Sequence, residues 1–136
     1  DYPYGLPVEQ VDGLIRQTYK NRPQMLARFG SMFFNRNIGP ELLNWFHGLG
    51  LEASSYATIK CLISLRDEDL RNDLGKIHIP TAIFHGVHDQ IVHFANAQVL
   101  QREIPGAQLF PFYNSGHGVV IDEMDAFNAA LLRFLL

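Results

Sequence analysis

The chain has 136 residues, enough for one domain with a sizeable core, and carries a net charge of −3 with a sequence pI near 6.0. Its lysines and arginines are scattered, which excludes a nucleic-acid-binding stripe, and a single cysteine, Cys61, excludes an internal disulfide and fits a reducing compartment. Because no apolar run reaches membrane-spanning length and no basic-then-apolar leader opens the chain, we expect a soluble, cytoplasmic protein without membrane contacts.

The first half of the chain, from residue 6 to about residue 74, shows helical periodicity and no convincing strand. Apolar residues recur at spacings of three and four, which is typical of amphipathic helices. We expect the second of these helices to include Phe33 and Phe34, and a short turn to follow at residues 70–74. The signals for helix starts and breaks are Pro7, Asn21-Arg22-Pro23, Gly39-Pro40 and either Ser54 or Ser55.

The second half changes to an alternation of strands and helices. β-branched and aromatic runs predict strands at residues 81–84 and 108–113, and apolar periodicity predicts helices at about 94–103 and 122–135. Ile104-Pro105-Gly106 ends the first of these helices. Strands separated by helices indicate parallel pairing, so the fold class is α/β.

Each of the two predicted strands runs into a glycine-containing loop that carries an ionisable side chain. Asp89 follows the first strand and the bend at Gly86, where a functional acid would be placed. The second strand is followed by the loop Asn114-Ser115-Gly116-His117-Gly118, where flanking glycines leave the imidazole of His117 room and exposure. Two neighbouring strands therefore end in one acid and one histidine.

The stretch Ile79-Pro80-Thr81-Ala82-Ile83-Phe84-His85-Gly86-Val87-His88-Asp89, followed after a helix and a strand by Gly116-His117, resembles the C-terminal half of an α/β-hydrolase. It is most similar to the bacterial non-haem haloperoxidase, arylesterase and perhydrolase group. The resemblance covers most of the chain and is strongest from Asp73 to Leu136. The chain departs from the group at Val87, His88 and His93 around the first loop and at Glu123-Met124-Asp125 after the second.

The resemblance implies catalytic roles for Asp89 and His117. In this family the chain order is serine nucleophile, acid, then histidine, and these two residues match the acid and the histidine. The histidine accepts the serine proton, while the carboxylate fixes the tautomer of the histidine and stabilises the imidazolium that forms. Residues 1–74 correspond to a helical cap and residues 75–136 to the last two βα units of the parallel hydrolase sheet.

The remaining parts of such an enzyme are absent from the sequence. Family members are about twice as long, and the missing part is N-terminal. None of the five serines, Ser31, Ser54, Ser55, Ser64 and Ser115, lies in a G-x-S-x-G nucleophile elbow, and no HGGG-type oxyanion loop is present. The expected fold is therefore incomplete, and the chain alone is expected to be inactive.

Simpler interpretations apply to the other candidate residues. Asp89 could be a turn aspartate that bonds its own backbone, and His117 a solvent-facing loop histidine. His85, His88 and His93 lack the companion ligands of a metal site, so no metal and no cofactor is expected. Cys61 in a helix is more often a small buried apolar residue than a nucleophile. Most aromatic residues of the cap would form its core, and some could face a substrate pocket.

Two functions remain open at this point. The first is half of a serine hydrolase that acts on small carboxylic esters, with perhydrolysis as a side reaction and with the serine supplied from outside the chain. The second is a non-catalytic truncated module that associates, with the missing N-terminal half or with itself, through an open sheet edge and an apolar face.

Overall fold

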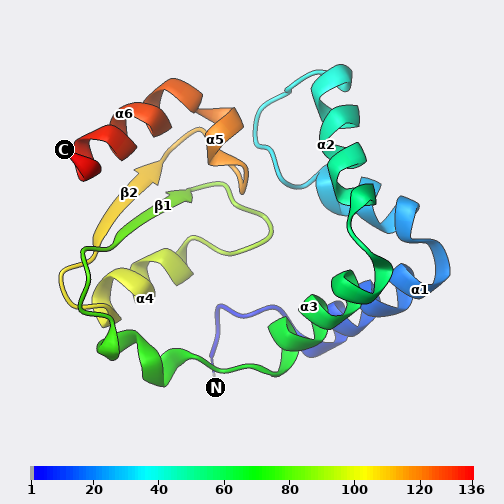
Figure 1. Ribbon diagram of the computed structural model, residues 1–136, viewed down its shortest axis with the longest axis horizontal. Helices are drawn as coiled ribbons and strands as arrows, with labels where there is room; N and C mark the ends of the chain where they lie inside the picture. The colour runs from blue at the N-terminus through cyan, green and yellow to red at the C-terminus, as the bar shows by residue number, and fades with distance from the viewer. Residues whose placement is uncertain (1) are drawn as a thin grey trace. The chain divides into compact units, whose positions relative to one another are not determined.

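The computed structural model describes residues 2–136, which form two compact units (Figure 1). Unit 1 contains residues 2–4, Met32–Ile38 and Leu70–Leu136, and unit 2 contains Gly5–Ser31 and Gly39–Asp69. The division into residues 1–74 and 75–136 stays a prediction. The units interleave in sequence, because Met32–Ile38 belong with the sheet.

Unit 2 consists of the helices α1 (Val8–Gly30), α2 (Pro40–Glu52) and α3 (Ser55–Asp67). The predicted break occurs inside α1, where Asn21 leaves the helical region with φ −160° and ψ 79°. Its Oδ1 accepts a hydrogen bond of 3.1 Å from the amide of Gln24 and restarts the helix beyond the break. The predicted cap of α3 is Ser54, whose Oγ accepts from the amide of Ala57 at 2.9 Å.

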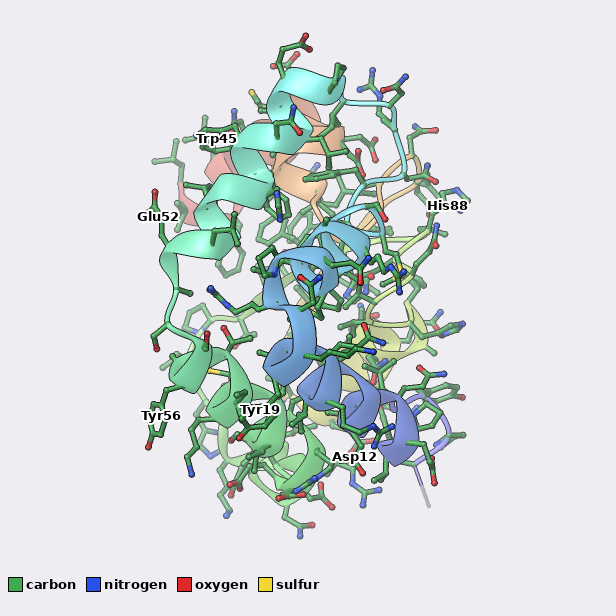
Figure 2. All side chains as sticks on the ribbon, turned by 90° about the vertical axis from the view of Figure 1, so that its right-hand side faces the viewer. Asp12, Tyr19, Trp45, Glu52, Tyr56 and His88 are labelled. Atoms are coloured by element: carbon green, nitrogen blue, oxygen red, sulfur yellow. The ribbon has the colours of Figure 1, made fainter. Side chains whose placement is uncertain are left out.

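In unit 2, α2 and α3 both pack against α1. Val11, Met25 and Ile59 are buried between them, and Arg66 on α3 forms an ion pair of 2.7 Å with Asp12 on α1. Figure 2 shows that several large aromatic side chains of this unit point outward instead of into its core. The exposed aromatic residues of its helices are Tyr19, Trp45 and Tyr56.

Unit 1 holds a parallel two-stranded sheet, as the alternation of strands and helices predicts. β1 (Ala82–Gly86) pairs with β2 (Gln108–Phe112) in a register that runs from Ala82 opposite Gln108 to Gly86 opposite Phe112. The described helices of this unit are the 3₁₀ helix η1 (Arg71–Lys76) and the α-helices α4 (Ala95–Glu103), α5 (Val119–Asp122) and α6 (Met124–Leu135).

Helices cover the two faces of this sheet. α4 and α6 lie on opposite sides of the strands (Figure 1), as expected for βαβα units. On the α6 side, Phe84 stacks on Phe110 with ring centroids 5.0 Å apart and meets Phe127 edge-on at 5.2 Å. On the α4 side, Ile83, Ala97 and Ile104 are buried.

Two local expectations were wrong. α1 ends at Gly30, so Phe33 and Phe34 lie in an irregular segment that packs within unit 1 instead of in a helix. The last helix begins earlier than expected, as the single turn α5, and is broken at Glu123, whose φ of −134° and ψ of 55° are not helical. Contacts with distant residues, described below for the site, override the apolar periodicity in both places.

The two edges of the sheet differ in their capacity to pair further. Gln108 donates to Thr81 O and Val87 donates to Phe112 O, so residues 108, 110 and 112 of β2 face β1, and the odd-numbered positions face outward. Pro111 therefore lies where its missing N–H would face the outer edge, a common device of edge strands. On β1 the amides of Ala82, Phe84 and Gly86 face outward with no such block.

Gly86 allows the two strand-end loops to cross in close contact. A Cβ atom at this position would lie 2.0 Å from the carbonyl oxygen of Gly116 and 2.4 Å from that of Ser115. Both neighbours are backbone atoms, so only a displacement of the loop could make room. His88 N also donates to Ser115 O at 3.0 Å, which holds the loops at this distance.

We expect Gly86→Ala to destabilise the chain by about 2 kcal/mol or more, because overpacking costs about 1–3 kcal/mol and the atoms that the new Cβ would meet belong to the backbone. The matched control is Gly75→Ala, because Gly75 lies in the same unit and an added Cβ there meets nothing within 4 Å. Urea unfolding followed by circular dichroism measures both variants. Equal midpoints for the two would contradict the close crossing of the loops.

Candidate functional site

Asp89 lies in the loop that follows β1, and its two carboxylate oxygens have different partners. Oδ1 accepts hydrogen bonds from the amides of Ile91 at 2.8 Å and Val92 at 2.9 Å. Oδ2 faces the loop after β2, where Nδ1 of His117 is 2.8 Å away. The backbone contacts of a turn aspartate and the contact with the histidine are thus made by separate oxygens of one side chain.

His117 lies in the loop after β2, which we call the histidine loop (residues 114–118). Because a carboxylate only accepts, its contact with Asp89 places the proton of the neutral imidazole on Nδ1 and leaves Nε2 as the basic nitrogen. The side chain of Asp89 is 2% exposed and that of His117 is 36% exposed. A shielded carboxylate thus orients an imidazole that solvent and ligands can reach.

A second histidine contacts the same carboxylate oxygen. His85 Nε2 lies 3.3 Å from Asp89 Oδ2 and 2.9 Å from the carbonyl oxygen of Val92. Since both neighbours are acceptors, Nε2 of His85 carries a proton. His85 lies in β1, and its contact with Asp89 was not identified from the sequence.

These contacts shift the pKa values of both groups. Burial by itself raises the pKa of the Asp89 carboxyl, but hydrogen bonds from His117, His85 and the amides of Val92 and Ile91 outweigh burial and hold that pKa well below its ordinary range. The hydrogen bond to Asp89 raises the pKa of His85 above its usual value, against the opposing effect of burial. Asp89 is therefore ionised at neutral pH.

The histidine loop is fastened to residues 33–36, which are remote in sequence but belong to the same unit. The amide of Gly118 donates to Phe33 O at 2.8 Å, and the side-chain amide of Asn35 donates to Asn114 O at 3.0 Å. The ring of Phe33 meets the imidazole of His117 edge-on, with centroids 4.8 Å apart. This segment supplies one wall of the site.

The glycines beside His117 have a second physical role besides leaving room for the imidazole. A Cβ at Gly118 would lie 2.4 Å from the ring of Phe34, and one at Gly116 would lie 2.8 Å from Phe33 O. Neither glycine has a positive φ among the described residues. They therefore allow the close approach of residues 33–36, in addition to leaving the imidazole exposed.

Two carboxylates that follow the histidine loop were not identified from the sequence. Asp122 is fully buried and accepts backbone amide bonds from Gly116 at 2.8 Å and from Asn35 at 2.9 Å. Glu123 Oε2 accepts from Ser115 Oγ at 2.6 Å and from the amide of Asn114 at 2.9 Å. The adjacent Asp122-Glu123 pair, a few residues beyond the histidine, was the available signal.

The remaining candidate residues from the sequence are His88, His93 and Cys61. His88 points outward (Figure 2), and His93 Nδ1 accepts from the amide of Ala95 at the start of α4. Within residues 2–136 the structure contains no group of three or more His, Cys, Asp or Glu residues suited to a metal ion. Cys61 is exposed, not buried as expected for a cysteine within a helix. The part of the chain that the structure describes has no helix long and apolar enough to cross a membrane.

Comparisons with known proteins place these features in a wider setting. No family model matches the chain. It is 45% identical over 133 residues to the AB hydrolase superfamily protein YisY of Bacillus subtilis, covering 98% of this chain and 50% of that protein. It is 33% identical over 141 residues to a non-heme haloperoxidase of Rhodococcus erythropolis, covering 98% of this chain and 51% of that enzyme.

A solved structure matches the chain over a similar extent. An esterase from Exiguobacterium antarcticum superposes with a TM-score of 0.95 at 44% identity, covering 98% of this chain and 50% of that one. The chain thus spans about half the length of the relatives that it matches.

The pKa shifts of Asp89 and His85 predict opposite pH dependences for their contributions to stability. The contribution of Asp89, whose pKa is lowered, is present above its ordinary value of 3.8 and is lost as the pH falls through the lowered pKa. The contribution of His85, whose pKa is raised, is complete below 6.5 and is lost as the pH rises through the raised pKa. We therefore expect Asp89→Asn to lower the melting temperature most between these two values, and less on either side.

Thermal unfolding followed by circular dichroism from pH 3 to pH 8 measures this difference. The control is His88→Gln, which changes an exposed histidine of the same loop and is expected to keep the wild-type pH profile. A difference between wild type and Asp89→Asn that stays constant across the whole range would contradict the assignment.

Proposed function

Since the chain is the C-terminal half of an α/β-hydrolase related to non-haem haloperoxidases and esterases, we propose that it supplies the acid and the base of a serine hydrolase acting on carboxylic esters. The observation that carries the proposal is the 2.8 Å contact between Asp89 Oδ2 and His117 Nδ1. It supports a shielded, ionised acid behind an accessible imidazole, as acyl transfer requires.

In the proposed reaction the serine comes from outside this chain. Nε2 of His117 takes the serine proton while the serine oxygen attacks the ester carbonyl carbon, and the resulting imidazolium gives that proton to the departing alcohol. Water then repeats the sequence on the acyl-enzyme and releases the acid. Asp89 keeps the imidazole in the tautomer with Nδ1–H and stabilises its cation. Perhydrolysis, with hydrogen peroxide in place of water, is a side reaction of the same chemistry.

Ser115 is unsuited to be the nucleophile. Its side chain is fully buried and its Oγ donates to Glu123. It also lies in the histidine loop instead of at a strand-to-helix elbow. The proposal therefore requires the N-terminal half of the fold, from a longer polypeptide or from a second one, to complete the site.

A specific observation also favours the alternative of an associating module. The outward amides of β1 are not blocked, whereas Pro111 interrupts the outer edge of β2, so a further strand would join at β1. Unit 1 also exposes a set of apolar side chains on and around the last helix, namely Val120, Met124, Leu132 and Leu135. Both features suit the missing half of the fold or a second copy of the chain.

We expect the chain alone to hydrolyse a short-chain aryl ester no faster than free imidazole. A hybrid that joins it to the half of the Exiguobacterium antarcticum esterase that this chain does not match should turn the ester over, because in our proposal that half carries the nucleophile and the oxyanion hole. In the hybrid, His117→Ala should lower kcat by about 10³-fold or more, since the triad acts as a unit. Release of the aryl alcohol measures all of these rates.

His88→Ala in the hybrid is the control, because it removes an exposed histidine of the neighbouring loop and should leave the rate unchanged. Turnover by the chain alone that disappears on Ser115→Ala would overturn the proposal, since the nucleophile would then lie within the chain.

We expect the isolated chain to associate at micromolar concentration, and Ala82→Pro to weaken this association. Ala82 is the first residue of β1, where proline is tolerated in a strand, and its amide faces the open edge. Sedimentation velocity across a concentration series measures both proteins. A wild-type chain that remains monomeric throughout would exclude the open edge as an association surface.

A further inference from the structure

Asp122 has a buried carboxylate that the proposed acid and base do not use. Its side chain is 0% exposed, and its two oxygens accept only backbone amides in the described contacts. Oδ2 accepts from Gly116 at 2.8 Å and from Asn35 at 2.9 Å, and Oδ1 accepts from Arg36 at 3.2 Å. A buried charge is tolerated when such donors replace water, and it then holds those donors in place.

The donors belong to two different segments that meet beside His117. Gly116 precedes His117 in the histidine loop, whereas Asn35 and Arg36 follow the irregular stretch after α1. Arg36 returns the contact, because its Nη1 donates to the backbone carbonyl oxygen of Asp122 at 2.7 Å. One side chain thus joins residues 33–36 to the loop that carries the imidazole.

This junction determines where the ring of Phe33 lies. Phe33 is two residues before Asn35, and its own carbonyl oxygen accepts from Gly118 at 2.8 Å. Its ring lies edge-on to the imidazole, at 4.8 Å between centroids and 89° between planes. The imidazole is therefore restrained at Nδ1 by Asp89 and along its ring by Phe33.

We infer that Asp122 is a positioning residue for His117, because through the amides of Gly116, Asn35 and Arg36 it holds the histidine loop and the ring of Phe33 in register with the imidazole. The inference rests on the proposed function for its catalytic consequence. A loosened imidazole would spend less time with Nε2 aimed at the serine hydroxyl, which lowers kcat more than it changes KM.

Glu123 offers a matched control within the same turn. Its carboxylate also holds the histidine loop, through Asn114 and Ser115, and its described link to residues 33–36 is an electrostatic attraction to Arg36 without a hydrogen bond. Asp122→Asn brings an NH₂ group against a backbone N–H, because both oxygens of Asp122 accept such groups. Glu123→Gln can keep its remaining oxygen at the position of Oε2, which accepts both described bonds of Glu123. Only the first substitution should separate Phe33 from His117.

Nuclear magnetic resonance of the 136-residue chain tests the contact without any catalysis. In the wild type we expect nuclear Overhauser effects between the Phe33 ring and the His117 ring, and a downfield Nδ1–H resonance from the bond to Asp89. Asp122→Asn should abolish the Overhauser effects and broaden the Nδ1–H resonance, whereas Glu123→Gln should keep the Overhauser effects. Their full retention in Asp122→Asn would overturn the inference.

Kinetics in the hybrid enzyme test the consequence. We expect Asp122→Asn to lower kcat by about 10-fold to 100-fold with KM changed by less than about threefold, as for a displaced catalytic group. Phe33→Leu should lower kcat in the same direction while leaving the buried carboxylate untouched. It decides the question if Asp122→Asn fails to fold, because a wild-type kcat in Phe33→Leu would then overturn the inference.

The two arms separate this inference from the proposed function. An inactive hybrid with the expected Overhauser effects would refute the hydrolase assignment and leave the positioning contact standing. If the hybrid is active but the His117 resonances of the 136-residue chain are unchanged by Asp122→Asn, the proposed function stands and the positioning inference is overturned.

Discussion

The site depends on keeping one carboxylate ionised where water hardly reaches it. Asp89 is 2% exposed at its side chain, and burial alone would favour its neutral form. Two imidazole N–H groups and two backbone amides replace the lost water and reverse that preference. This requires the loops after β1 and β2 to meet at one edge of the sheet, which parallel pairing achieves and which the absence of a side chain at Gly86 permits.

Residues 33–36 pack with the sheet instead of extending the helix before them because backbone groups of this segment find hydrogen-bond partners there. The amides of Asn35 and Arg36 donate to Asp122, and the carbonyl oxygen of Phe33 accepts from Gly118, so these groups are satisfied without helical hydrogen bonds. Gly116 and Gly118 have no side chains to prevent this approach. Adjacent carboxylates at positions 122 and 123 then fasten the loop from two directions, which limits the freedom of His117.

The described sheet has only two strands, and such a sheet is rarely stable without further partners. The Exiguobacterium antarcticum esterase is about twice as long as this chain, and in our proposal its additional half corresponds to what would cover the unblocked edge at β1 and the apolar side chains exposed around α6. The catalytic and associating interpretations are connected only if the missing half of the fold covers that edge and face, because that half would also bring the nucleophile, whereas a second copy of the chain would not.

The sequence by itself determined the class of fold, the parallel strands, the break near Pro23 and the pairing of Asp89 with His117, because each depends on short-range patterns or on a motif of local spacing. It did not determine the irregular path of Phe33, the second histidine on Asp89 or the burial of Asp122. Those features depend on contacts between residues far apart in the chain, or on which side chains the packed loops exclude from water. Only the tertiary structure decided them, because the residue type alone does not say whether packing buries a carboxylate or leaves it exposed.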